Sequence, residues 1–190
     1  MLRRLVLPVL LVVVVAVLGG CDSTDERACC LPHGAIGARY IAIGGEDGPL
    51  GGCTGQESGR DGGQVQDFAN GAMFWTEETG AWEVYGQIGA KYTEIGGPTS
   101  AVGWPVSGEL STPNGVGRFN RFEQGNIYFA PTGTHPVYGA IFAEWGRQGF
   151  ENGRFGFPTS DEFDIPGGRQ TNFEGGWIRW IADGDQVLTS

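Results

Sequence analysis

Few side chains in this 190-residue chain are of the types that carry out nucleophilic or acid–base chemistry. The histidines are His33 and His135, and the chain has no Gly-x-Ser-x-Gly segment that would present a nucleophilic serine on a sharp turn. An acyl-transfer enzyme needs a Ser or Cys nucleophile with a base and an orienting acid. We expect both histidines in exposed loops. The sequence therefore predicts a protein that is not an enzyme and that carries no cofactor.

Carboxylates are the other side chains that could act on a substrate, because a pair of them can hydrolyse a glycosidic bond. Glu123 and Glu174 lie in two similar segments, Phe-Glu-Gln-Gly and Phe-Glu-Gly-Gly. Recurrence favours a structural role, so we expect each glutamate to accept backbone N–H groups at a hairpin turn. Asp183-Gly184-Asp185 could contribute to a calcium site, but no EF-hand spacing surrounds it and Asp-Gly is foremost a turn signal. We expect no metal site.

Apart from Cys21, the chain has three cysteines: Cys29, Cys30 and Cys53. In an oxidising compartment an odd number leaves one thiol free or bonded to another chain. A disulfide from Cys53 to Cys29 or Cys30 would close a loop of about two dozen residues and stabilise the fold by roughly 3 kcal/mol. Three free thiols are the alternative. A zinc site is disfavoured because no histidine cluster accompanies the cysteines.

Aromatic side chains are the residues that could bind a ligand without catalysis. A sugar stacks its C–H face on an aromatic ring, while amides, carboxylates and backbone groups bind its hydroxyls. Trp104 and its counterpart Phe157 lie in Gly-Pro turns, and Trp177 has the opposite strand parity to Trp180. We therefore expect Trp104, Phe157 and Trp177 to be exposed and to bind the ligand. Strand alternation instead predicts that three other rings belong to the core: Trp75, Phe129 and Trp180.

The elements that hold these residues recur three times along the chain. One phrase reads GAIGARY from residue 34, GQIGAKY from residue 86 and GAIFAEW from residue 139, so the spacings are 52 and 53 residues. Such a period is typical of repeat architectures. The sequence therefore predicts three units: residues 34–85, 86–138 and 139–190.

Within each unit the pattern predicts a short helix followed by a β-hairpin. Ile36, Tyr40 and Ile43 fall at i, i+4 and i+7, and Gly44 follows where a helix C-terminus favours positive φ. Later in the unit, alternating residues indicate half-buried strands. Because one unit cannot bury its apolar face alone, the units must stack. We expect one α+β domain over residues 34–190: three tandem units of helix, Gly-Pro turn and β-hairpin about a pseudo-symmetry axis, as a partial or closed ring.

The N-terminal segment has the features of an export signal. Two arginines precede the apolar run of residues 5–18, whose length fits a secretory signal peptide better than a transmembrane helix. The run ends in Leu18-Gly19-Gly20-Cys21, which resembles the lipobox of bacterial lipoproteins. The resemblance implies that residues 1–20 are removed and that Cys21 carries palmitate-type acyl chains, with residues 21–33 as a tether. An ordinary cleaved signal peptide is the alternative.

The charge of the chain limits its partners. A formal net charge of -10 argues against nucleic acid, whose phosphates require basic patches. No polybasic segment follows Cys21, so a lipid anchor must hold the protein at the extracytoplasmic face of the cell membrane. Residues 22–33 reach at most about 40 Å when extended. The ligand must therefore lie close to the membrane.

One turn in each unit carries a family resemblance. These segments read Leu-Gly-Gly-Cys, Val-Gly-Trp-Pro and Phe-Gly-Phe-Pro from residues 50, 102 and 155, and together they resemble the LGFP repeat, an actinobacterial cell-envelope family. Unit 1 departs from the pattern, since Gly52 replaces the aromatic residue and Cys53 replaces the proline. Similar repeats occur in wall-associated proteins of mycolic-acid-bearing bacteria, often beside an enzyme.

What the resemblance implies is a secreted, lipid-anchored module that binds cell-envelope polysaccharide of arabinogalactan or peptidoglycan type without catalysis. A different class of function is a scaffold lipoprotein that binds envelope proteins, such as cell-wall enzymes. An envelope hydrolase is a third class, which the scarcity of catalytic side chains disfavours.

Overall fold

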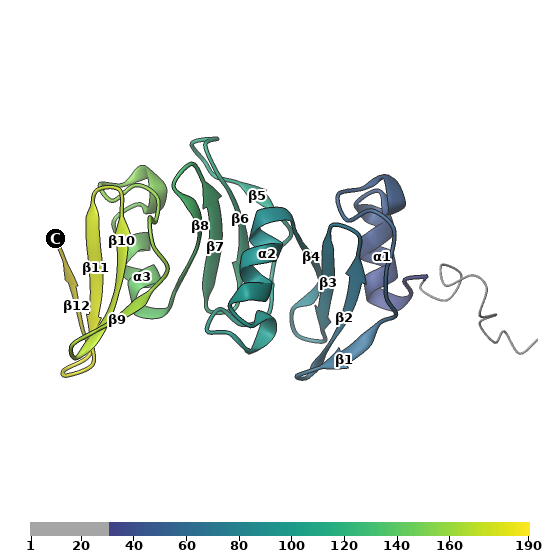
Figure 1. Cartoon of the computed structure of the whole chain (residues 1–190), viewed down its shortest axis with the longest axis horizontal. Coiled ribbons are helices and arrows are strands. Elements are labelled where there is room, and N and C mark those ends of the chain that lie inside the picture. Colours follow the sequence, from purple (N-terminus) through teal and green to yellow (C-terminus); the bar gives the residue numbers. More distant parts are fainter. Residues whose placement is uncertain (1–30) are drawn as a thin grey trace, which may run out of the picture.

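The computed structural model describes residues 31–190, which form three units in a row (Figure 1). Helices and antiparallel four-stranded sheets alternate along the row, with α1 at one end and β12 at the other. The expectation of three tandem units of helix and strand is confirmed. The described residues form an open row, so a closed ring is not the arrangement of these units. A pseudo-symmetry axis stays a prediction.

Each unit contains a nine-residue helix, a 3-10 turn and a four-stranded sheet, so each sheet is larger than the expected hairpin. The first unit has α1 (Gly34–Ala42), η1 (Gly45–Asp47), β1 (Ser58–Arg60), β2 (Gly63–Phe68), β3 (Gly71–Thr76) and β4 (Gly80–Tyr85). The second has α2 (Gly86–Glu94), η2 (Gly97–Thr99), β5 (Leu110–Ser111), β6 (Arg118–Phe122), β7 (Gly125–Ala130) and β8 (Gly133–Tyr138). The third has α3 (Gly139–Arg147), η3 (Phe150–Asn152), β9 (Phe163–Ile165), β10 (Gly168–Phe173), β11 (Gly176–Ile181) and β12 (Gln186–Thr189).

The helices form and end as their sequences predict. In α1, Ile36 and Tyr40 are buried on one face, as the apolar spacing requires. The chain then leaves the helix through Gly44, whose φ of 107° lies in the left-handed region that glycine adopts without strain. None of the helices over residues 31–190 has the length and apolar character needed to cross a membrane.

The expected hairpins form the centre of each sheet. In the second and third units, a glutamate in the hairpin turn accepts a hydrogen bond from the LGFP-type turn earlier in the same unit. β6 pairs with β7 from Arg118↔Phe129 to Phe122↔Gly125. The backbone N–H of Trp104 donates to Glu123 Oε2 at 2.8 Å, and the N–H of Phe157 donates to Glu174 Oε2 at 2.7 Å. The structural role predicted for these two glutamates is confirmed. The strands on both sides of each hairpin were not expected from the sequence. On one side, β1, β5 and β9 have only two or three residues each, too few for an alternating pattern; on the other side, β4, β8 and β12 are longer.

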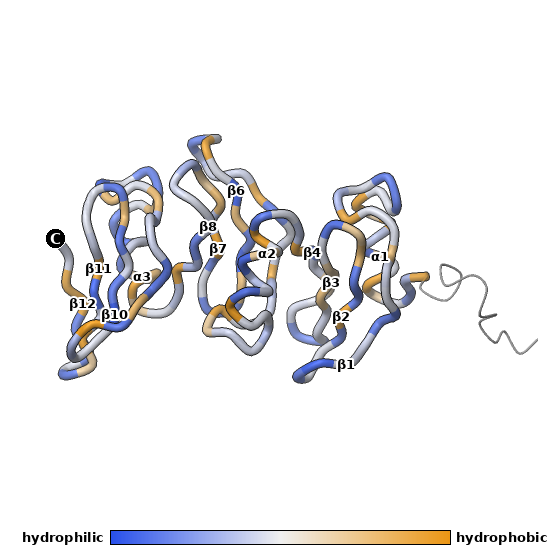
Figure 2. Tube along the Cα trace, viewed as in Figure 1, coloured by the Kyte–Doolittle hydropathy of each residue, from blue (hydrophilic) through white to orange (hydrophobic). Residues whose placement is uncertain are grey.

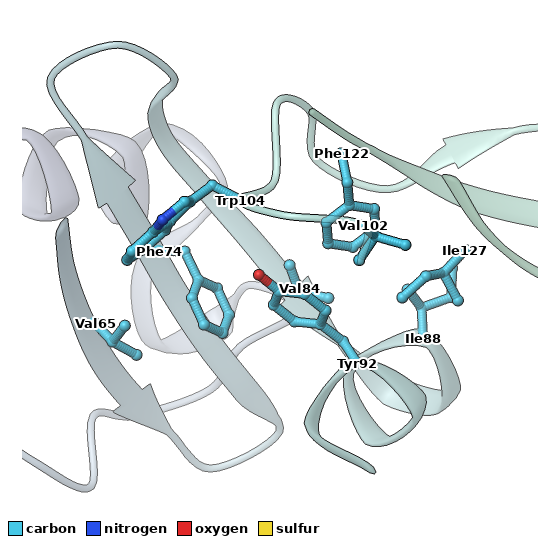
Figure 3. Packing of buried hydrophobic residues seen from close by; sticks show 9 residues of the cluster. All are labelled: Val65, Phe74, Val84, Ile88, Tyr92, Val102, Trp104, Phe122 and Ile127. Atoms are coloured by element: carbon cyan, nitrogen blue, oxygen red, sulfur yellow. The ribbon is translucent and has the colours of Figure 1, made fainter. Parts of the chain in front are cut away.

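The hydrophobic core is shared between neighbouring units. Each of α2 and α3 packs on its own sheet and on the sheet of the preceding unit. Hydropathy accordingly alternates along the strands, while the β1–β2 turn is hydrophilic (Figure 2). Figure 3 shows the shared core at the first junction, where residues of the first sheet meet α2 and the second sheet: Val65, Phe74, Val84, Ile88, Tyr92, Val102, Trp104, Phe122 and Ile127.

Candidate functional site

Trp104 and Phe157 are not on the surface, contrary to the expectation from their turns. They are only 8% and 4% exposed. Trp104 points toward Phe74 of the preceding unit, with ring centroids 6.4 Å apart (Figure 3). A Cβ atom at Gly63 would lie 2.5 Å from the Trp104 ring, and one at Gly117 would lie 3.1 Å from the Phe157 ring. The bare glycine backbone makes room for the ring of the next unit, so both aromatics join units and are no longer candidates for ligand binding.

The first unit differs at this turn, as its sequence indicates. Cys53 makes the isolated β-bridge to Phe68 that Pro105 makes to Phe122 in the second unit. Within residues 31–190, Cys53 is not a free thiol. Its expected partners, Cys29 and Cys30, lie outside the described residues, as does the lipidation candidate Cys21.

Trp177 lies on the face of the last sheet that is directed away from α3, since Ile178 and Trp180 pack toward the helix. In the two earlier sheets this face is covered by the next unit. The cross-strand pair Val65↔Phe74 recurs there as Phe119↔Tyr128, but in the last sheet the pair is Gln170↔Arg179.

The outer face of the last sheet is therefore polar around Trp177. The Arg179 guanidinium carbon lies 4.0 Å from the Trp177 ring centroid, and Arg179 Nε donates to Gln170 Oε1 at 2.5 Å. Trp177 is half-buried. Its orientation fits the sequence-based expectation, and its binding role stays a prediction.

Three aromatic rings that were expected in the core lie at its margin instead. Phe129 is 42% exposed, and Trp75 and Trp180, at the same position of their units, are half-buried. Strand alternation identified the correct face of the sheet. It could not show that the centre of the core is occupied by the residue two positions earlier, such as Ile127, which is fully buried.

Each marginal ring has a polar partner directly opposite on the neighbouring strand. Trp75 pairs with Gln64, Phe129 with Arg118, and Trp180 with Arg169. Residues directly opposite each other share one face of the sheet. Each ring is therefore flanked by an amide or a guanidinium that could bind a hydroxyl group.

A glutamate at the same position of each unit completes the arrangement. Glu109 Oε1 lies 3.5 Å from Arg118 Nε, and Glu162 Oε1 lies 2.5 Å from Arg169 Nε. In the first unit Glu57 lies 3.5 Å from His33 Nδ1, because glutamine replaces the arginine. We call the three sets the ring–carboxylate sites. The first comprises Trp75, Gln64, Glu57 and His33; the second Phe129, Arg118, Glu109 and Tyr85; the third Trp180, Arg169, Glu162 and Tyr138.

Tyrosines from the preceding unit contact two of these glutamates. Tyr85 is hydrogen-bonded to Glu109, and Tyr138 to Glu162. Burial raises the pKa of both glutamates above its ordinary value, although the neighbouring arginines lower it. Burial also raises the pKa of both tyrosines, so each hydroxyl is a neutral donor toward its carboxylate.

In the third unit the ring–carboxylate site borders a cavity of about 230 Å³. Its lining includes Tyr138, Glu162, Arg169 and Trp180. An aromatic ring beside charged hydrogen-bonding groups in a small concavity is suited to one sugar residue. Sequence reasoning missed these sites. The signal that could have found them is the recurrence of Glu57, Glu109 and Glu162 at one position of the repeat.

The two histidines considered for catalysis lie in different parts of the fold, His33 before α1 and His135 in β8. The side chain of His33 is 79% exposed, as expected. His135 lies in β8 rather than in a loop, and its Nδ1 is 2.7 Å from Asp161 Oδ1, which connects the second and third units. No group of three or more His, Cys, Asp or Glu residues in the described part of the chain could hold a metal ion.

The fold and the recurring sites define a tandem-repeat protein in which each unit completes the core of the one before it. The LGFP repeat family matches residues 50–100 and 102–153. These two stretches cover more than half of the chain, which therefore belongs to the LGFP repeat family. Each match runs from one LGFP-type turn through the next helix, so it is offset from the units defined above. A comparison with curated proteins found no match.

Proposed function

We propose that this LGFP-repeat protein is an exported lipoprotein that binds membrane-proximal cell-envelope glycan without catalysis. The observation that carries the proposal is that the ring–carboxylate site recurs at an equivalent position of every unit. A glycan polymer repeats its own residues, so several sites can bind one chain at once. Linked weak sites gain avidity from their effective concentration without any new contact.

The composition of the sites favours binding over hydrolysis. Glycosidases place two carboxyl groups on either side of the scissile bond. In the third site, Glu162 is the buried carboxylate, whereas the nearby Asp164 side chain is 85% exposed and its Oδ1 accepts from Arg169 at 2.8 Å. One buried acid beside an aromatic ring supports the recognition of hydroxyl groups.

The N-terminal part of the proposal rests on the sequence. Cleavage before Cys21 would leave a lipidated cysteine at the extracytoplasmic face of the membrane, tethered to the first unit. We further propose that Cys53 is disulfide-bonded to Cys29 or Cys30, which would fix the tether to the turn of the first unit. Both features restrict the protein to ligands close to the membrane.

The test is a retention assay of the purified full-length lipoprotein, in mild detergent, on immobilised envelope polysaccharide. We expect retention, and we expect Phe129→Ala or Trp180→Ala to weaken it about two- to tenfold, as the loss of one aromatic contact of ~0.5–1.5 kcal/mol implies. The double variant should lose more than either single variant because avidity is lost.

Phe163→Ala is the matched control, because Phe163 is 39% exposed and belongs to no ring–carboxylate site. Equal retention of the Phe163 and Phe129 variants would contradict the assignment of the sites. Capture of envelope proteins without retention on polysaccharide would favour the scaffold function instead. Release of reducing sugar would identify a hydrolase.

A further inference from the structure

A groove between the second and third units holds side chains that the ring–carboxylate sites do not use. It has a volume of about 390 Å³. Two ring pairs line it, one from the second sheet and one from the third unit. Phe119 and Tyr128 stack with centroids 5.1 Å apart and an interplanar angle of 15°, and the Phe142 and Phe150 centroids are 5.5 Å apart. The groove therefore offers apolar surface from both units.

Two oppositely charged side chains, Glu151 and Arg121, line the same groove but do not form an ion pair with each other. Glu151 is 8% exposed and forms no ion pair with any residue of the described range 31–190; its Oε1 accepts from Asn152 Nδ2 at 3.2 Å. Arg121 is exposed and likewise forms no ion pair within that range. A buried carboxylate without a cation is costly, so a further hydrogen-bond donor from a ligand would stabilise Glu151.

Both charges lie near the Tyr128 hydroxyl, which accepts from Asn126 Nδ2 at 2.9 Å. Burial raises the pKa of Tyr128 most strongly, and Glu151 raises it further, while the bond from Asn126 and the charge of Arg121 lower it. The tyrosine therefore stays neutral, and its own proton remains available to an acceptor. All four of these groups line the groove.

The first junction shows that stacking of units does not require this polar set. Tyr128 corresponds to Phe74, and the pair Arg121↔Asn126 corresponds to Asp67↔Ala72 in the first sheet. Glu151, the second residue of η3, corresponds to Pro98 in η2. The first junction has its core without counterparts of Glu151, Asn126 and the Tyr128 hydroxyl, so the stacking of two units does not by itself require these groups.

We propose that this groove binds one N-acetylated amino-sugar residue. An acetamido group presents a donor and an acceptor on opposite sides, together with a methyl group. Its N–H would donate to Glu151, its carbonyl would accept from Arg121, and its methyl would pack against the aromatic rings. Tyr128 and Asn126 are placed for the ring hydroxyls. The proposal rests on the proposed function in that the ligand is a glycan, but the site is separate from the ring–carboxylate sites.

Titration calorimetry of the full-length lipoprotein with three soluble oligosaccharides tests this. The probes are a β-1,4-linked N-acetylglucosamine tetramer, its de-acetylated form and a glucose tetramer of the same linkage. We expect binding of the first and at least tenfold weaker binding of the other two. Arg121→Ala and Glu151→Gln should each weaken binding of the acetylated tetramer about tenfold, as the loss of a charged hydrogen bond implies.

Asp67→Ala is the matched control, because Asp67 occupies the position of Arg121 at the first junction. Tyr128→Phe keeps the stacked ring and removes the hydroxyl, so it reports on binding even if the charged variants unfold. Equal affinity for acetylated and non-acetylated tetramers would overturn the proposal, as would binding that is unchanged in all three groove variants. If the tetramer does not bind while polysaccharide retention still depends on Phe129 and Trp180, this inference fails and the proposed function survives.

Discussion

The contact between Gly63 and Trp104 shows how a glycine makes room for a tryptophan ring from another unit. The Trp104 ring covers the backbone of Gly63, which lies in β2 of the preceding unit. The same relation recurs with Phe157 over Gly117. In both cases the ring of one unit fills a site that another unit leaves open. These contacts therefore contribute to the stability of the row and not to ligand binding.

Replacing Trp104 tests this at the level of one residue. Trp104→Ala should lower the free energy of unfolding by about 3–5 kcal/mol, because truncation of a buried aromatic ring leaves a cavity. Urea denaturation followed by circular dichroism measures the change. Phe129→Ala is the control and should lower it far less, since that ring is partly exposed. A small stability change with a large loss of polysaccharide retention would restore Trp104 as a binding residue.

At the scale of elements, the loop that follows each LGFP-type turn connects two units. Glu162 in this loop contacts Tyr138 at the end of β8 and Arg169 in β10. Glu109 makes the same connection between β4 and β6 through Tyr85 and Arg118. The carboxylates thus have two roles, since they join units and flank the marginal rings.

The raised pKa of Glu162 predicts a pH dependence of stability. The native state holds this proton more readily than the unfolded chain, so the group's contribution is present below the ordinary pKa of 4.5 and is lost as pH rises through the raised value. In the variant Glu162→Gln, the glutamine side chain at this position has no group that titrates. The free energy of unfolding of the wild type, relative to that of Glu162→Gln, should therefore fall between pH 4 and pH 7 in urea titrations. A difference that is constant across this range would contradict the assignment.

At the scale of the whole molecule, the last sheet differs from the two before it. The face that carries Val65↔Phe74 and Phe119↔Tyr128 in the earlier sheets carries Gln170↔Arg179 in the third. A sheet face that carries this polar pair offers less apolar surface on which another unit could stack.

Placing the apolar pair of the first sheet on the third sheet should create an exposed apolar face on which another unit can stack. The double variant Gln170→Val with Arg179→Phe should self-associate with increasing concentration, because an exposed apolar face that is complementary to another part of the molecule favours head-to-tail contacts. Sedimentation velocity over a range of concentrations measures this. Leu188→Ala in the wild-type background controls for mutation of the same face. A double variant that stays monomeric at every concentration would show that this face does not direct stacking.

The sequence by itself determined the features that depend on contacts within one unit. These features are the triplication, the short helices followed by Gly44 and its counterparts, the central hairpins, and the role of Glu123 and Glu174. Local periodicity carries this information, because side-chain direction in a helix or strand follows directly from position.

Only the tertiary structure decided which faces are covered. Trp104 is buried because a glycine about 40 residues earlier approaches it, a relation that no local pattern records. Phe129 has the parity of a core residue yet reaches the surface, and Glu151 and Arg121 meet at one groove only once two units have stacked. Burial is a property of what packs against a surface, and here the covering surface belongs to a different unit of the row.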